Sequence, residues 1–209
     1  NDNNSGTISL PLKSIGKAIS KAISLTDTIY VNKGRYYENI SFAGKAILIS
    51  SNYKRLNDTS LITSTLIDGG NIGNTVTINS GETLKSRLEG FSITNGYSGL
   101  YISSGKLSTS DLRFFKNNSY HAIGSAIIVT GHYSAGMIAN NTVVENHSGT
   151  GGVIYIAGWG SYGKFNNLIV RNNIGNINAI IVCDVGSADL NNAMMFNNGD
   201  IPAIGVMNT

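Results

Sequence analysis

The sequence predicts a right-handed, single-stranded parallel β-helix of about six to eight coils, preceded by an amphipathic capping helix. Three observations predict this fold. One motif recurs at a nearly fixed period, a second motif recurs in phase with it, and no helical pattern separates them. Apolar runs of four or five residues are strands rather than helices, and a period of roughly 20 to 30 residues is typical of solenoids.

The first motif is an asparagine-rich unit of eight residues. It reads DLRFFKNN at 111–118, NNTVVENH at 140–147, NNLIVRNN at 166–173 and NNAMMFNN at 191–198, with a looser copy, EGFSITNG, at 89–96. The seventh residues, Asn95, Asn117, Asn146, Asn172 and Asn197, lie 22, 29, 26 and 25 residues apart. We expect Asn117, Asn146, Asn172 and Asn197 to stack at one corner as a ladder of side-chain amides.

The second motif is a short β-branched run. It reads TVTI at 75–78, GLYI at 99–102, AIIV at 126–129, VIYI at 153–156 and AIIV at 179–182, with a partial copy, AIGV, at 203–206. Because no ten-residue helical pattern lies between the runs, leucine-rich, ankyrin and Rossmann folds are excluded. A parallel β-helix remains, in which like positions of successive coils stack about 4.8 Å apart.

Alternation along the strands predicts which side chains form the core. In the second motif the expected inward residues are Val76, Ile78, Leu100, Ile102, Ile127, Val129, Ile154, Ile156, Ile180 and Val182. In the first motif they are Ile93, Phe115, Val144, Val170 and Met195. Burial of each such side chain contributes roughly 1.5–3 kcal/mol, so stacked columns of this kind supply a continuous core.

The two ends of the chain differ. Residues 11–24 carry apolar side chains at helical spacing, which predicts one amphipathic helix with Ser9 as its cap and Pro11 in its first turn. We assign residues 1–26 to a polar lead and this capping helix, and residues 27–209 to the β-helix, with 50–64 as a loop excursion. The last coil shows no capping element, which predicts that the solenoid continues or that a partner covers it.

Composition excludes several classes of function. Charged residues make up 13% of the chain and the net charge is +3 without a basic run, so nucleic acid is not the expected partner. There is no apolar run long enough to span a membrane. A single cysteine, Cys183, excludes an internal disulfide framework, and we expect it to be a small, partly exposed residue after an inward Val182.

Several segments resemble known β-helix proteins. PLKSI at 11–15, DTIYV at 27–31 and GRYYE at 34–38 resemble the N-terminus of the pectin-lyase-like superfamily. GGVIY at 151–155 and the Phe-x-x-Asn at 115–118 resemble the repeats of chlamydial polymorphic outer-membrane proteins and of microbial and archaeal adhesin-like surface proteins. The resemblance implies display or adhesion at the cell surface, or contact with carbohydrate.

Residues that carry chemistry do not form a recognisable catalytic set. GRYYE resembles the first motif of pectin methylesterases, but the aspartate pair of those enzymes has no counterpart. The acids Asp68, Asp111, Glu145, Asp184, Asp189 and Asp200 are scattered, and His121, His132 and His147 lie on successive turns without other ligands at metal spacing. We therefore assign no catalytic residue, no metal site and no cofactor.

Outward positions offer the candidate binding residues. Phe114, Val143, Ile169 and Met194 form an expected apolar stripe for a partner. Trp159, Tyr162, Tyr133 and Tyr120 form an expected sugar-stacking platform, and Tyr101 and Tyr155 are further candidate binding residues at outward strand positions. Shielding of the strands by loops and local packing of a long turn are the alternatives.

These observations favour a non-enzymatic, extracellular, adhesin-like surface or fibre module that contacts a glycan or a protein partner. One alternative is a polysaccharide lyase or hydrolase, which requires two acids, or an acid and a base, that converge in a groove. A second alternative is a fibre subunit that self-associates through the uncapped C-terminal coil.

Overall fold

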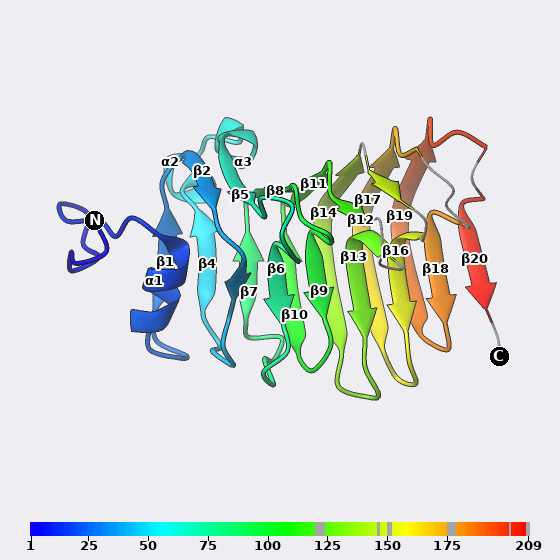
Figure 1. Cartoon of the computed structure of the whole chain (residues 1–209), viewed down its shortest axis with the longest axis horizontal. Coiled ribbons are helices and arrows are strands. Elements are labelled where there is room, and N and C mark those ends of the chain that lie inside the picture. Colours follow the sequence, from blue (N-terminus) through cyan, green and yellow to red (C-terminus); the bar gives the residue numbers. More distant parts are fainter. Residues whose placement is uncertain (120–123, 146, 150–151, 175–178, 201, 208–209) are drawn as a thin grey trace.

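The computed structural model shows an all-β parallel solenoid with only 8% helix. It describes residues 1–119, 124–145, 147–149, 152–174, 179–200 and 202–207. Successive coils lie side by side along one long axis, from β1 at one end to β20 at the other (Figure 1). The expected fold class is therefore confirmed. The number of turns, about five, is slightly below the six to eight expected.

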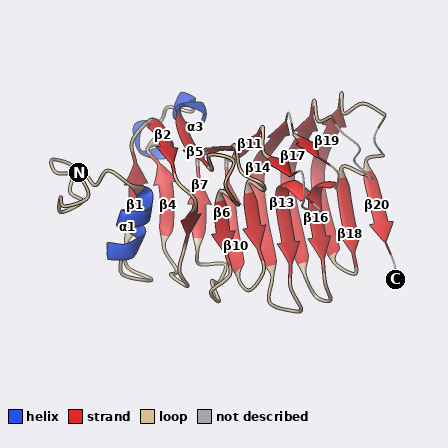
Figure 2. Ribbon diagram, in the orientation of Figure 1, coloured by secondary structure: helices blue, strands red, loops and turns tan. Residues whose placement is uncertain are grey.

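Two large parallel sheets build the solenoid (Figure 2). One sheet contains β1 (Thr28–Val31), β4 (Leu48–Ser51), β7 (Arg87–Glu89), β10 (Lys106–Ser110), β14 (Gly136–Glu145), β17 (Tyr162–Arg171), β19 (Ser187–Phe196), β11 (Arg113–Phe115), β8 (Ser92–Thr94), β5 (Thr65–Asp68) and β2 (Gly34–Tyr37). The other contains β3 (Ile40–Ser41), β6 (Val76–Ile78), β9 (Leu100–Ile102), β13 (Gly124–Thr130), β16 (Gly152–Ala157), β18 (Ile181–Asp184) and β20 (Ile204–Met207). The short strands β12 (Asn118–Ser119) and β15 (Ser148–Gly149) pair separately.

The first sheet bends at a corner in every middle and late coil. Asp111, Asn141, Asn167 and Asn192 occupy this corner with φ between 51° and 58°, a left-handed conformation that Asn and Asp tolerate better than most residues. The Asn141 side chain donates to Asp111 Oδ1 at 3.0 Å, and Asn167 and Asn192 each donate to the coil before at 2.9 and 2.8 Å. Asp111, Asn141, Asn167 and Asn192 therefore form one hydrogen-bonded column along this corner.

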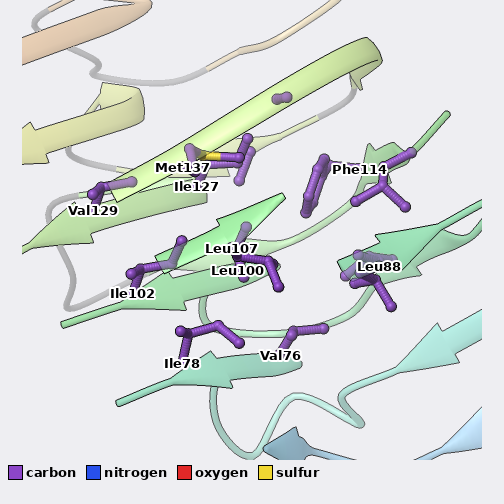
Figure 3. Packing of buried hydrophobic residues seen from close by; sticks show 14 of the residues in the cluster. Val76, Ile78, Leu88, Leu100, Ile102, Leu107, Phe114, Ile127, Val129 and Met137 are labelled. Carbon is purple, nitrogen blue, oxygen red and sulfur yellow. The ribbon is translucent and has the colours of Figure 1, made fainter. Parts of the chain in front are cut away.

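The inner core is a set of stacked aliphatic and aromatic columns (Figure 3). The expected inward residues of β6, β9, β13 and β16 are all buried there. Phe114 pairs with Ile93 and Val144 in register and is fully buried, whereas Phe115 lies outside and is half-buried. The expectation for Phe115 is therefore wrong by one residue, because two adjacent phenylalanines fit either alternation.

A one-residue error affects Val182 in β18, whereas Ile180, just before the strand, is buried in the core cluster as expected. Ile154 pairs with Ile181 and Ile156 with Cys183, so Ile181 and Cys183 belong to the inner core while Val182 stacks on Tyr155 outside. Residues 179–183 are all apolar, and such a run carries no alternation that sets its register. Cys183 is consequently a buried free thiol, and burial raises its pKa.

The second corner carries a buried polar column that differs from the expected one. Its members are Asn117, His147, Asn173 and Asn198, which are all buried. Asn117, Asn173 and Asn198 each accept a backbone N–H from the preceding coil, donated by Gly96, His147 and Asn173 at 2.9, 3.0 and 3.1 Å. Asn172 and Asn197 instead supply the left-handed turn immediately before the column, and Asn146 lies outside the described residues.

The N-terminal helix covers the first coil but is shorter than expected. It is α1 (Ile15–Lys21), its cap is Ser14 rather than Ser9, and Asp2 accepts the backbone N–H groups of Lys13 and Ser14 at 2.9 Å. Ile15 and Ile19 pack into the core cluster. The helix contacts β1 and β3 at the blue end of the molecule in Figure 1.

Side chains of the first coil hold α1 at both ends. Glu38 accepts the N–H groups of Ile15 and Gly16 at 2.8 Å, and the Lys45 ammonium donates to the carbonyls of Ile19, Ser20 and Ala22 at 2.6, 3.0 and 2.9 Å. An acid at the N-terminus and a base at the C-terminus both complement the helix dipole. The lead segment, α1 and β1 line an open pocket of about 600 Å³.

The excursion at 50–64 is more ordered than the expected irregular loop. It contains α2 (Tyr53–Leu56) and α3 (Ser60–Ser64), and α3 lies above β5 in Figure 1. The Tyr53 hydroxyl donates to Asp111 at 2.5 Å, and Lys54 pairs with the buried Glu89 at 2.9 Å. The Ser92 hydroxyl donates to the carbonyl of Ile62 at 3.0 Å, which fixes the excursion against the sheet.

Candidate functional site

Two of the expected aromatic residues lie on neighbouring turns and face solvent. Tyr133 and Trp159, here called the aromatic turn, have 75% and 56% of their surface exposed. The N–H of Tyr133 donates to the carbonyl of Trp159 at 2.7 Å, so the two turns are fixed to each other. The Tyr133 ring packs on Gly160, where a Cβ atom would lie 2.4 Å from the ring, so a side chain at this position would displace it.

The other expected aromatic residues do not join this pair as one platform. Tyr162, at the start of β17, is half-buried with its ring over Gly136. Tyr101 and Tyr155 lie on the outer face of the second sheet, where Tyr155 is buried against Ile128 and Val182. Its hydroxyl donates to Asp184 at 3.0 Å, and burial together with this carboxylate raises the pKa of Tyr155. Tyr120 lies outside the described residues.

The expected apolar stripe is interrupted. Phe114 belongs to the core, and the residue that shares the outer column with Val143, Ile169 and Met194 is Arg113. Only Met194 of the three is exposed, at 54%, while Val143 and Ile169 are half-buried. Arg113 therefore occupies the outer position that was expected for Phe114, next to residues of α3.

Arg113 belongs to a groove that the sequence did not single out. The groove, here called the arginine groove, has a volume of about 470 Å³. Its lining residues come from α3, the first corner and the outer faces of β11, β14 and β17: Thr59, Ile62, Thr63, Asp111, Leu112, Arg113, Asn141, Val143, Glu145 and Arg171.

Glu145 is the central charged residue of the arginine groove. Its Oε1 accepts from Arg113 Nε at 2.5 Å and its Oε2 from Arg171 Nε at 2.7 Å, while its own side chain is only 4% exposed. Burial alone would raise the pKa of Glu145, but the hydrogen bonds from Arg113 and Arg171 outweigh it and lower the pKa. Glu145 is therefore a stable carboxylate that fixes two guanidinium groups.

Asp111 occupies the other end of the arginine groove. It accepts from the Tyr53 hydroxyl and from the Asn141 amide. Burial and the adjacent Asp111 raise the pKa of Tyr53, so this tyrosine remains a hydrogen-bond donor. Each of the two carboxylates that line the groove thus has protein partners of its own.

The remaining candidates for chemistry stay apart. Asp184 binds Tyr155, while Asp189 is exposed and lies 4.0 Å from the Lys164 ammonium. His132 lies on an exposed turn, His147 is buried in the polar column and His121 is outside the described residues. Within the described ranges, no three or more His, Cys, Asp or Glu side chains gather as metal ligands.

A signal for the arginine groove was nonetheless present in the sequence. Arg113, Glu145 and Arg171 are charged residues within strand motifs of a chain that has few charges. Charged residues on parallel strands pair only when the register brings them together. Aligning the asparagine motifs placed Phe115 opposite Val144, whereas Phe114 occupies that position in the structure. With the correct register, Arg113 is diagonal to Glu145 and Arg171 lies directly opposite it.

The function of the chain is inferred from its fold and from the sites described above, because comparisons with known proteins give no match. None of the helices in the described part of the chain is long and apolar enough to cross a membrane. No known protein family, curated protein or solved structure matches the chain.

Proposed function

We propose that the protein is a non-enzymatic, adhesin-like surface module, displayed outside the cell, that contacts a glycan through its aromatic turn. The observation that carries this proposal is the exposure of Tyr133 and Trp159 on two turns joined by a main-chain hydrogen bond. Two exposed aromatic rings on adjoining turns present flat apolar faces of the kind that stack on the apolar faces of sugars. The resemblance to pectin-lyase-like and adhesin-like repeat proteins supports the same proposal.

The solenoid gives these two rings a fixed separation. Turns of adjacent coils follow the spacing of paired strands, about 4.8 Å, and the hydrogen bond between Tyr133 and Trp159 keeps their backbones in contact. A rigid scaffold lowers the entropy cost of binding, because the rings need little reordering when a ligand arrives. The geometry therefore suits a short stretch of an extended saccharide.

Binding to a panel of glycans tests this proposal. The wild-type chain is expected to bind at least one glycan, and Trp159→Ala is expected to weaken that binding about tenfold or more, as for loss of a stacking ring. Tyr97→Ala is the matched control, since Tyr97 is 49% exposed on a turn elsewhere in the solenoid. If both variants bind as tightly as the wild type, the aromatic turn is not the contact site.

A carbohydrate-active enzyme is the second candidate, and one observation favours it. Two carboxylates, Asp111 and Glu145, line the same arginine groove. Glu145, however, is neutralised by two arginines, and Asp111 is engaged by Tyr53 and Asn141. The same glycan panel discriminates the candidates: release of reducing ends, or the ultraviolet absorbance of unsaturated products, would establish catalysis.

A self-associating fibre subunit remains the third candidate. Within the described residues, β19 pairs only with β17 and β20 only with β18, so both present a free edge. Phe196 and Ile204 are exposed beside these edges. Free edges of parallel sheets accept further strands, so this end of the solenoid is the surface through which copies would associate.

A further inference from the structure

The arginine groove holds two guanidinium groups in an arrangement that leaves most of their N–H donors free. Arg113 and Arg171 both reach Glu145 through Nε, at 2.5 and 2.7 Å. Within the described part of the chain, the Nη atoms of these two arginines have no acceptor. Four strong terminal donor groups thus remain available at the surface of the groove.

Both arginines are already ordered before a ligand arrives. The Arg113 guanidinium lies over the Phe115 ring, 4.4 Å from its centroid, and Arg171 lies between Glu145 and Phe196 in the strand register. Arg113 is only 31% exposed and Arg171 41%. Because a planar guanidinium that is fixed at Nε loses little further freedom, its remaining N–H groups bind at a low entropy cost.

The charge balance at this end of the groove favours a single negative charge. Two arginines face one carboxylate beside the half-buried Val143, while Asp111 makes the four charged residues that line the groove neutral overall. The opposite end holds Asp111, whose two oxygens are already bonded to Tyr53 and Asn141. A monoanionic group therefore gains most at the arginine end, where the surroundings are partly dry and charge-assisted hydrogen bonds are strongest.

We infer that the arginine groove binds the carboxylate group of a small hydroxylated ligand through the Nη atoms of Arg113 and Arg171. The planar fork of arginine matches a planar carboxylate. Val143 and Ile62 line the groove as apolar surface for the carbon body of the ligand, and Thr59 and Thr63 of the excursion add polar lining for its hydroxyl groups. The inference does not rest on the aromatic turn, which lies on other turns of the solenoid.

Titrations of the full chain, followed by NMR, test the inference. The probes are gluconate, its neutral counterpart sorbitol, and sulfate. Gluconate is expected to shift the amide signals of the strands that carry Arg113 and Arg171, sorbitol is expected to leave them unchanged, and sulfate is expected to bind more weakly than gluconate. Equal responses to gluconate and sorbitol, or no response to gluconate, would overturn the inference. Sulfate binding as tight as gluconate would show a general anion site and overturn the carboxylate assignment.

Variants assign the binding to the groove. Arg171→Ala is expected to weaken gluconate binding about tenfold to a hundredfold, as for loss of a charge-assisted contact. Lys164→Ala is the matched control, because Lys164 lies on the same strand and has only a long contact to Asp189 at 4.0 Å. If Arg171→Ala disturbs the coil, Arg171→Lys preserves the charge and is expected to lose more affinity for gluconate than for sulfate. The assignment would be contradicted if gluconate binding were unchanged in Arg171→Lys, or unchanged in an Arg171→Ala variant that is shown to be folded.

Trp159→Ala separates this inference from the proposed function. It is expected to leave gluconate binding unchanged while it weakens glycan binding at the aromatic turn. Loss of gluconate binding in this variant would place the carboxylate at the aromatic turn and overturn the assignment to Arg113 and Arg171.

Discussion

Acidification is expected to destabilise the fold through one buried histidine. His147 is 1% exposed, and burial lowers its pKa from 6.5 to about 4, against the opposing effects of nearby backbone carbonyls and of Glu145. Its Nδ1 lies 3.1 Å from the carbonyl of Asn117, and its backbone N–H donates to Asn173. The histidine occupies a column that is otherwise made of asparagines, so its protonation would place an uncompensated charge inside the polar ladder.

The sign and size of the effect follow from proton linkage. Below pH 6.5 the unfolded chain binds a proton at His147 that the folded chain does not bind until about pH 4. Stability therefore falls as the pH falls through this window and levels off below it, with a total loss of about 3 kcal/mol. The lowered pKa of Glu145 acts in a different window, because its contribution is lost only as the pH falls below 4.5 and through the lower folded-state value.

Urea unfolding at a series of pH values measures this loss, with His147→Asn as the matched variant. Asparagine already occupies the equivalent positions 117, 173 and 198, so this variant keeps the column. We expect the wild type to lose stability between pH 6.5 and about 4 while the variant loses much less. Equal slopes for the two proteins in that window would refute the reasoning.

Two further predictions concern the core and its cover. Phe114→Ala is expected to cost about 3–5 kcal/mol in urea unfolding because Phe114 is fully buried, whereas Phe115→Ala is expected to cost far less; similar losses would contradict the register. Deletion of residues 1–24 removes α1 and uncovers the core around Ile15 and Ile19, so light scattering is expected to show aggregation. A soluble, monomeric truncation would show that α1 is not needed as a cap.

The sequence predicted the solenoid because its period is carried by many weak, repeated signals. Strand existence, parallel stacking and the inward residues of β6, β9, β13 and β16 all follow from alternation within short apolar runs. The errors arise in segments whose residues do not alternate between apolar and polar side chains. Adjacent phenylalanines at 114 and 115, the apolar run 179–183 and the asparagine doublets at 172–173 and 197–198 each fit two registers that differ by one residue.

The arginine groove and the length of α1 depend on contacts that no local pattern encodes. Glu145 meets Arg113 and Arg171 across three coils, and α3 reaches the same place from an excursion about 50 residues earlier in the chain. Asp2 holds the backbone of Lys13 and Ser14 and lies at the start of α1, which leaves Pro11 outside the helix. Contacts with residues that are distant in the sequence thus determine both the arginine groove and the start of α1.

The way in which α1 is held has a consequence for the order of events during synthesis. A helix of seven residues is unstable by itself in water, and the groups that secure its two ends, Glu38 and Lys45, are translated only after it. The segment 15–21 therefore stays unstructured until the opening coil, which follows it in the chain, has been synthesised and has closed. Docking of α1 thus follows the folding of residues that are translated after it.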